Sequence, residues 1–467
     1  LSGSGIVEYS WSHDGSALLF PLAGDVFYHK IGSKGAKRLL ETDAFETDIK
    51  FSPKGNYISF IREQNLYILN IASGKEQAIT TLGGGNIKFG MAEFVAQEEM
   101  GRMTGYWWSP DESYIAFTKV DESPVLTITR SEIYADRIAT IEQKYPKAGT
   151  NNVRIELGIA KISDLKQEWI DLGNNEDIYL ARAQWINGNR LSYQLQSRDQ
   201  KRLSLQAYNV ESKSSQTLLT EASDTWINLH DDLRFLPTQE FIWASERDGY
   251  KHLYLYSNTG KLLRQLTKGE WVVDGLKAHH ADTLFIQARK DTPLESHIYS
   301  LNINTGDMKR LSETNWYNDA SFSKDASIFI NNRSNVNTPP QVSLHDAQGK
   351  LLTWLNKNEV TQEHPLYKHK DSWIKPEFGT FKSQDGAEIY YRLYTPESAK
   401  TNPEATLPAI VYLYGGPHVQ VVSNQWGGNR GLLMQHWVNK GYVVFSIDNR
   451  GSSARGKAFE DPIYRKM

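Results

Sequence analysis

The sequence contains no cysteine among its 467 residues. Without thiol groups, the chain can form neither a disulfide framework nor a thiolate site for a metal ion or a redox reaction. Its stability must therefore come from packing. We expect no cofactor and no metal site.

Long hydrophobic runs are missing as well. The longest apolar stretches, such as 409–413 and 442–445, have the length of a β-strand, whereas a membrane-spanning helix needs about 20 apolar residues. We therefore expect no membrane span. The sequence begins at Leu1 without a charged and then apolar leader, so we expect any export signal to be absent already. This start favours a periplasmic or secreted protein, with the cytoplasm as the alternative.

A large excess of charge of one sign is also missing. The 52 basic and 55 acidic residues give a formal net charge of -3. Such a chain has little electrostatic attraction to a phosphate backbone or to an anionic membrane, so nucleic acid is not an expected partner. The hydrophobic content of 39% is that of a globular protein, and the length allows two or three domains.

One pattern recurs along the first three quarters of the chain. An aromatic residue is followed by a turn with Ser, Asp or Gly and then by an alternating apolar strand. Short strands with such turns, repeated at roughly 40 to 55 residues, are typical of four-stranded propeller blades. Clear copies occupy 11–20, 51–60, 108–117 and 322–330, and weaker copies begin near Trp185, Phe235 and His279.

These copies predict a mainly β fold with a seven- or eight-bladed β-propeller over residues 1–373. An eighth blade could lie within 331–371 or be completed by a further N-terminal strand, and we favour eight. An array of β-sandwiches is the alternative, but sandwich domains do not impose one repeated turn motif.

Two intervals between the copies are too long for a bare blade. Residues 91–100 carry Met91, Phe94 and Val95 at helical spacing among good helix formers, which predicts a short inserted helix. A longer extension covers 121–164. Insertions of this length are commonly loops or arms that carry contacts or function.

The pattern changes after Trp373. A strand, a helix and a second strand follow one another here. Both strands are apolar enough for burial on both faces, which indicates that an α/β sheet begins in residues 374–467. The predicted strands are 378–382, 388–394, 407–413 and 442–447, and the predicted helix is 429–439 with Leu432, Leu433 and Trp437 on its apolar face.

Three segments resemble one enzyme family. The segment FVAQEE at 94–99, followed by TGYWWSP at 104–110, resembles the double-glutamate segment of the dipeptidyl peptidase IV family. YLYGGP at 412–417 resembles the oxyanion tyrosine segment of that family, and DNRGS at 448–452 is similar to a stretch in prolyl oligopeptidase relatives. The segments follow one another in the family's order, and the match extends over nearly the whole chain.

The resemblance implies a serine exopeptidase that releases N-terminal dipeptides, with X-Pro or X-Ala preferred. Residues 1–373 would form the propeller, which gates substrates and recognises their amine. Residues 374–467 would form the first part of an α/β-hydrolase domain. The relatives are commonly homodimers that use a propeller arm and the hydrolase domain, so a homodimer is implied as well.

The adjacent carboxylates of Glu98 and Glu99 are the candidate substrate-binding residues. Two neighbouring carboxylates repel one another, and a substrate ammonium group placed between them relieves that repulsion while donating charge-assisted hydrogen bonds. Such a pair favours a free α-amino group, and the resemblance implies that it sets the cut two residues away. A solvated acidic pair on a surface helix is the alternative. No arginine is assigned as the partner of the substrate carbonyl.

Tyr414 is the candidate catalytic residue, with a role in the oxyanion hole. It follows an apolar strand and precedes a Gly-Gly-Pro turn, a position at the carboxyl edge of a sheet where ligands gather. A packing role is the alternative. We reject His418 as the base, because in hydrolases of this kind the histidine follows the serine and the aspartate.

The sequence contains no Gly-x-Ser-x-Gly nucleophile elbow. The nearest segment, 451–456, has arginine in place of the second glycine and is interpreted as a loop. The resemblance implies that the catalytic Ser, Asp and His lie beyond Met467, so that residues 1–467 need their own C-terminal hydrolase segment.

Two other functions remain open at this point. One is a tripeptidyl or acylaminoacyl peptidase of the same superfamily. The other is a propeller that binds peptides without chemistry.

Overall fold

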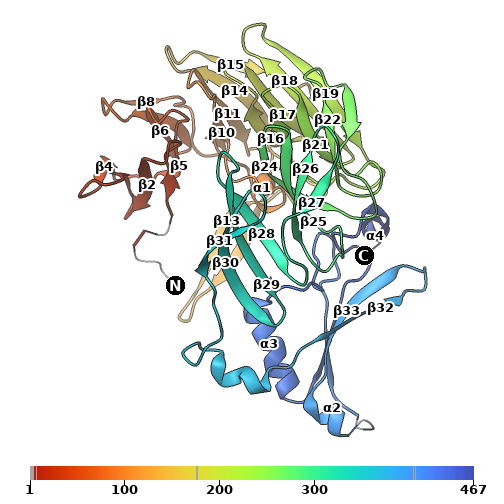
Figure 1. Ribbon diagram of the computed structural model, residues 1–467. Helices are drawn as coiled ribbons and strands as arrows, with labels where there is room; N and C mark the ends of the chain where they lie inside the picture. Colours follow the sequence, from red (N-terminus) through yellow and green to blue (C-terminus); the bar gives the residue numbers. More distant parts are fainter. Residues whose placement is uncertain (1–4, 7, 175–176, 403, 405, 467) are drawn as a thin grey trace. The chain divides into compact units, whose positions relative to one another are not determined.

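The computed structural model of the chain describes residues 5–6, 8–174, 177–402, 404 and 406–466 (Figure 1). The chain divides into two compact units, Leu1–Leu229 and His230–Met467. Most described residues of both units lie in small antiparallel sheets, and helices are few and short.

The first unit consists of four antiparallel sheets and one separate hairpin among its described residues. The sheets are β1 (Ser10–Trp11), β2 (Ala17–Leu22), β3 (Asp25–Lys30) and β4 (Lys37–Leu40); β5 (Thr47–Phe51), β6 (Tyr57–Arg62), β7 (Asn65–Asn70) and β8 (Glu76–Ala78); β9 (Ile87–Phe89), β10 (Tyr106–Trp108), β11 (Tyr114–Asp121), β14 (Arg154–Lys161) and β15 (Gln167–Ile170); and β16 (Ile178–Trp185), β17 (Arg190–Ser197), β18 (Arg202–Asn209) and β19 (Ser214–Ala222). The hairpin is β12 (Thr127–Ile133) with β13 (Ile138–Lys144), and the helix α1 spans Phe94–Glu98.

The second unit consists of three antiparallel sheets and one mixed sheet among its described residues. The antiparallel sheets are β20 (Arg234–Phe235), β21 (Phe241–Ser245), β22 (His252–Tyr256) and β23 (Leu262–Gln265); β24 (Val273–His280), β25 (Thr283–Ala288), β26 (His297–Asn302) and β27 (Met308–Arg310); and β28 (Tyr317–Phe322), β29 (Ile328–Asn335), β30 (Thr338–Asp346) and β31 (Leu351–Asn356). The mixed sheet contains β32 (Glu377–Lys382), β33 (Glu388–Tyr394), β34 (Ala409–Tyr412) and β35 (Val443–Ile447), and the helices are η1 (Tyr367–Ser372), α2 (Glu397–Thr401), α3 (Gly428–Asn439), α4 (Lys457–Glu460) and η2 (Asp461–Ile463).

The seven antiparallel sheets follow one another along the chain and confirm the predicted mainly β fold with blade-like repeats. Each predicted copy of the turn motif connects two successive strands of one sheet. Residues 331–371, where an eighth blade was considered, instead complete the sheet of β28 to β31 and continue into η1.

The serine of the motif explains why the turn recurs. In the first copy the Ser12 hydroxyl donates to Asp14 (2.7 Å) and accepts the backbone N–H of Ala17 (2.9 Å). Short polar side chains of this type satisfy backbone groups within turns. The same bonds start from the serines of the third and fourth clear copies, Ser109 and Ser323.

The hydrophobic core of each unit lies between successive sheets. Ile58 and Phe60 of β6, for example, pack with Leu19 and Val26 of the preceding sheet. Similar buried clusters join the next pairs of sheets along the chain. Since burying one such side chain contributes roughly 1.5 to 3 kcal/mol, each sheet depends on its neighbours for stability.

Of the two predicted insertions, 91–100 contains a short helix and 121–164 contains a β-hairpin. Residues 91–100 contain the predicted helix, but α1 is only five residues long, and Met91 lies outside it in a β-bridge with Thr104. The 121–164 extension contains the β12–β13 hairpin, which pairs with no other sheet among the described strands, and then β14, which returns to the sheet. We call β12–β13, residues 127–144, the arm.

The mixed sheet confirms the predicted α/β segment. Its strand order is β32-β33-β35-β34, and β34 runs parallel to β35 after the crossover through α3. β34 was expected to be buried on both faces. It is instead the edge strand among the described residues, and Val411 on it is 59% exposed.

The buried face of α3 also differs from the prediction. Leu432 and Leu433 were expected to face the sheet, but they are 38% and 45% exposed. Met434 and Val438 are buried instead, in a cluster with Val444 of β35. These two residues are four positions apart and therefore share one face of the helix, while Trp437 packs beside them as expected.

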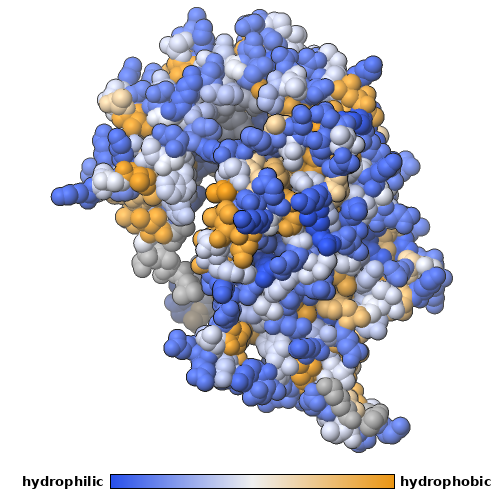
Figure 2. Space-filling view, in the orientation of Figure 1, coloured by the Kyte–Doolittle hydropathy of each residue, from blue (hydrophilic) through white to orange (hydrophobic). Residues whose placement is uncertain are grey.

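The surface is mainly hydrophilic on the face that Figure 2 shows, with apolar side chains in small scattered patches. Among the described residues, no helix is long and apolar enough to cross a membrane. The periplasmic or secreted location stays a prediction.

Candidate active site

Glu98 and Glu99 lie side by side at the carboxyl end of α1. Glu98 is the last helical residue and Glu99 is the C-cap, whose N–H donates to the backbone oxygen of Val95 (2.9 Å). Both side chains are exposed. The structure therefore presents the predicted carboxylate pair to solvent from one short, ordered element of the first unit.

A buried carboxylate begins α1 and was missed by the sequence analysis. Glu93 is 2% exposed and accepts hydrogen bonds from the N–H groups of Val95 and Ala96 (2.5 and 3.0 Å). Burial raises the pKa of Glu93, and these hydrogen bonds partly offset that effect. Acidic residues are favoured near helix N-termini because of the helix dipole, so the sequence did hold a weak signal for this residue.

A buried arginine holds the other end of the same segment. The backbone N–H of Arg102 donates to Ala96 O (2.8 Å), and its guanidinium donates to backbone oxygens of Leu180 and Thr104 (3.2 and 2.7 Å). Burial lowers the pKa of Arg102 to about 10, opposed by the nearby charge of Glu93. α1 is therefore held at both ends, which fixes the backbone that carries its two exposed carboxylates.

An aromatic cavity adjoins the segment that follows the glutamates. It has a volume of about 620 Å³ and opens to solvent. Thr104, Tyr106 and Trp107 line it, together with Trp185 of β16 and Trp11 of β1. Such walls offer apolar and π contacts to a peptide.

Tyr414 lies in the second unit, two residues after β34, and its side chain is 57% exposed. Gly415 has a φ of +83°, which turns the chain sharply after the tyrosine and which L-residues with a side chain rarely adopt. A phenol on such a turn can donate a hydrogen bond to an anion. The structure thus places Tyr414 at the end of a sheet strand, as predicted.

Asp448, the first residue of the DNRGS stretch, holds the chain after Tyr414. It follows β35 directly and is 2% exposed. Its carboxylate accepts the N–H groups of Val421 and Val422 (2.7 and 3.1 Å). Burial raises the pKa of Asp448 to about 6, although both hydrogen bonds act in the opposite direction. Residues 451–456, which were interpreted as a loop, lie in no helix or strand.

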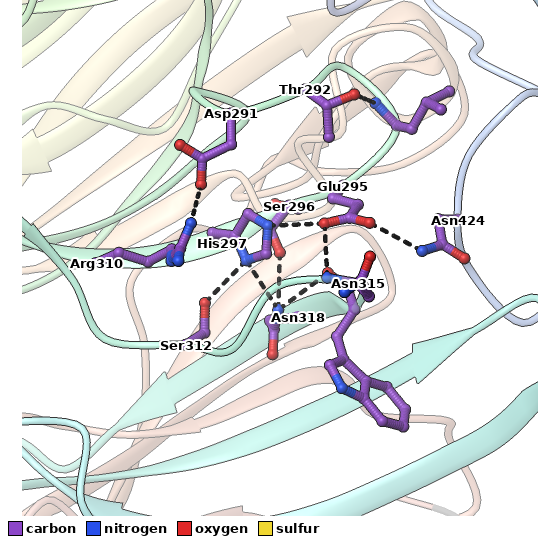
Figure 3. Close-up of polar contacts among 12 residues, drawn as sticks. Asp291, Thr292, Glu295, Ser296, His297, Arg310, Ser312, Asn315, Asn318 and Asn424 are labelled. Carbon is purple, nitrogen blue, oxygen red and sulfur yellow. Dashed lines mark hydrogen bonds and ion pairs between the residues drawn. The ribbon is translucent and has the colours of Figure 1, made fainter. Parts of the chain in front are cut away.

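A Ser–His–Glu arrangement in the second unit has the appearance of a catalytic triad (Figure 3). Ser312 Oγ lies 3.1 Å from His297 Nδ1, and His297 Nε2 lies 3.1 Å from Glu295 Oε2. However, Ser312 Oγ also accepts the N–H of Ile298 (3.0 Å), and His297 is fully buried. The serine is therefore held in the blade and is not available as a nucleophile.

The histidine–hydroxyl pair of this arrangement recurs in another sheet, where the other ring nitrogen, His252 Nε2, faces the backbone oxygen of Gly269 (2.8 Å) instead of a carboxylate. In β22, His252 Nδ1 lies 2.9 Å from Thr267 Oγ1, and that hydroxyl accepts the N–H of Leu253 (3.0 Å). The spacing of 15 residues is the same as that between His297 and Ser312. Because the histidine–hydroxyl pair recurs in successive sheets, it indicates a contact that stabilises each sheet, not an active site.

No group of three or more His, Asp and Glu side chains that could hold a metal ion occurs in the described ranges.

Comparison with known proteins gives consistent matches. Residues 9–340 match the family model described as dipeptidyl peptidase IV N-terminal region. The chain is 27% identical to human dipeptidyl peptidase 8 over 99% of its length, and 27% identical to dipeptidyl peptidase 4 of Trichophyton rubrum over 90% of its length. It is also similar to the crystal structure of Porphyromonas gingivalis dipeptidyl peptidase 4, with a TM-score of 0.90 and 26% identity over 99% of this chain and 67% of that one.

The chain is shorter than these relatives. It spans 62% of the human protein and 56% of the Trichophyton rubrum protein.

Proposed function

The chain belongs to the dipeptidyl peptidase IV family, and we propose that it forms part of a serine exopeptidase that releases dipeptides from the free N-terminus of oligopeptides. Proline or alanine is the preferred second residue in this proposal. Residues 1–373 act as the propeller that gates and recognises the substrate. Residues 374–467 begin the hydrolase domain.

The carboxylate pair of Glu98 and Glu99 is the observation that carries the proposal. The two side chains are adjacent and exposed, on a helix fixed by Glu93 at one end and Arg102 at the other. A substrate ammonium group neutralises their mutual repulsion and donates charge-assisted hydrogen bonds to both. Because the pair is fixed, the bound amine fixes how far along the peptide the scissile bond lies.

Tyr414 donates its phenolic hydrogen to the oxyanion of the tetrahedral intermediate in this proposal. In this proposal the serine nucleophile, its histidine base and the orienting aspartate come from residues after Met467. The serine oxygen bonds to the substrate carbonyl carbon to form the acyl-enzyme, while the histidine passes the serine proton to the leaving amine. The edge of the mixed sheet is consistent with this arrangement, because β34 has a strand on one side only among the described residues. Further strands of a hydrolase sheet would cover its apolar edge.

A panel of chromogenic peptides tests the proposal on the full-length protein. We expect cleavage of free-amine X-Pro and X-Ala substrates and labelling by a serine-reactive fluorophosphonate probe. Preferred cleavage of X-X-Pro or of N-acylated substrates would instead favour a tripeptidyl or acylaminoacyl peptidase. Peptide binding without probe labelling would favour a propeller that binds peptides without chemistry.

The arm supports the homodimer that the resemblance implies. Ile133 and Ile138 face each other across its two strands and are 81% and 68% exposed. An isolated two-stranded hairpin is marginally stable in water, and exposed apolar groups of this kind mark contact surfaces. We therefore propose that the arm contacts a second copy of the chain.

Replacing both isoleucines with lysine should separate the dimer. Buried apolar anchors at interfaces contribute about 2 kcal/mol or more each, so the loss of two anchors, about 4 kcal/mol, should raise the dissociation constant of the I133K/I138K variant roughly 1000-fold. Analytical ultracentrifugation of the full-length protein measures this change. The control is L82K, because Leu82 is 80% exposed and lies outside the arm. Unchanged dimerisation of the arm variant would exclude the arm as the contact.

A further inference from the structure

The segment that carries Tyr414 connects β34 to α3, and we call residues 413–427 the strap. The side chain of Tyr414 is more than half exposed, so packing contributes little to its position. The location of its hydroxyl therefore depends on how the strap backbone is held. Asp448 holds the strap from the hydrolase side through the N–H groups of Val421 and Val422.

The opposite side of the strap contacts the loop between β25 and β26, residues 289–296. Gln420 Nε2 donates to the backbone oxygen of Pro293 (2.9 Å), and Arg289 donates to Gln420 Oε1. Arg289 is itself fixed, because its Nε donates to Asp274 (2.9 Å) and its Nη2 to the hydroxyl of Tyr317 (2.9 Å). The 289–296 loop, through Arg289 and Pro293, thus holds the strap at Gln420.

Asn424 makes the most complete contact with this loop. Its backbone N–H donates to Leu294 O (2.8 Å), and its side-chain Nδ2 donates to Glu295 Oε1 (2.9 Å). Its side-chain Oδ1 accepts the N–H of Val336 (3.4 Å). Figure 3 shows Asn424 reaching Glu295 from the C-terminal part of the chain.

Glu295 is oriented by bonds on its other oxygen. His297 Nε2 lies 3.1 Å from Oε2, and the N–H of Asn315 donates to the same atom (3.0 Å). Burial alone would raise the pKa of Glu295, but the hydrogen bonds from His297, Asn424 and Asn315 hold it below its usual value. The group facing Asn424 is therefore a pre-oriented carboxylate at neutral pH, and a single donor from the strap satisfies its free oxygen.

We propose that Glu295 and Asn424 are positioning residues for the oxyanion hole: their contact fixes the strap, and through the strap it fixes the hydroxyl of Tyr414. The inference rests on the proposed function. It connects a blade of the predicted propeller with the predicted hydrolase segment. It also assigns a role to Glu295. The bond between His297 and Ser312 forms at Nδ1 of the histidine, whereas Glu295 lies at Nε2, so that bond does not require the carboxylate.

Exchanging the two polar groups tests the contact in the full-length enzyme. N424D places a carboxylate against Glu295 and should lower kcat by roughly 10- to 100-fold with little change in KM, because a small misplacement affects the transition state most. The double variant E295Q/N424D should recover most of this loss. There the new amide donates to the new carboxylate, while the amide oxygen still accepts from His297 and Asn315.

Two comparisons separate positioning from general destabilisation. The control N429D adds the same charge at an exposed position of α3 and should leave kcat unchanged. In the Y414F background, N424D should lower kcat by less than about twofold, because both changes act on one group.

The outcomes distinguish this inference from the proposed function. Equal losses from N424D with and without the Tyr414 hydroxyl, or no recovery in the double variant, would overturn the positioning role. A wild-type kcat in N424D would overturn it as well. Failure of the wild-type enzyme to cleave X-Pro substrates would instead contradict the proposed function.

Discussion

Replacing Glu98 or Glu99 with glutamine in the full-length enzyme should lower kcat/KM for free-amine X-Pro substrates by roughly 10²- to 10³-fold, or about 3 to 4 kcal/mol. In the proposed function, each carboxylate accepts a charge-assisted hydrogen bond from the substrate ammonium group. The neutral amide keeps the shape of the side chain but loses the charge. Steady-state kinetics with one chromogenic X-Pro substrate measures the effect.

The change should leave the fold intact, because both side chains are exposed and lie at the end of α1, not in a core. The control variant E211Q removes the same charge from an exposed turn of the first unit and should behave like wild type. Acetylation of the substrate amine should reproduce the loss in the wild-type enzyme. Unchanged kcat/KM in both glutamine variants would show that the pair is a solvated surface feature.

Replacing Tyr414 with phenylalanine should lower kcat by roughly 10²- to 10³-fold, the usual loss when one oxyanion donor is removed. KM should change little, since the hydroxyl contacts charge that develops only in the transition state. The same substrate and assay apply. A phenylalanine ring fills the same space, so packing around the Gly415 turn should be preserved.

The control for this variant is Y442F, which removes a hydroxyl from a partly exposed tyrosine of the same unit. Its kinetics should match those of the wild-type enzyme. If Y414F kept the wild-type kcat, Tyr414 would be a packing residue of the turn, and the oxyanion donor would have to be sought elsewhere.

The elements that the sequence predicted well are those fixed by local patterns. The turn motif of Trp11 to Asp14 recurs because its serine and aspartate accept the same backbone N–H groups in the first, third and fourth clear copies. Strands β32 and β33 were located because alternating residues and an Asp-Gly turn determine both register and connection. Glu98 and Glu99 could be named as candidates for a similar reason, since they lie in a contiguous motif, and their role in binding stays a prediction.

The features that the sequence did not predict depend on tertiary neighbours. The buried face of α3 is set by the sheet beneath it, so Met434 and Val438 face inward although the leucines beside them are more hydrophobic. β34 is apolar along its length, yet its exposure depends on whether a further strand pairs with it. The contact between Glu295 and Asn424 joins residues 129 positions apart, a separation that no local pattern reveals.

We propose above all that the carboxylate pair of Glu98 and Glu99 sets the cut two residues from a free amine. The most direct test incubates the full-length enzyme with a peptide of about ten residues that has proline second, and identifies the products by mass spectrometry. The same peptide with an acetylated amine is incubated in parallel. We predict release of the N-terminal dipeptide from the free peptide and no cleavage of the acetylated one. Release of a tripeptide, or equal cleavage of both peptides, would contradict the account.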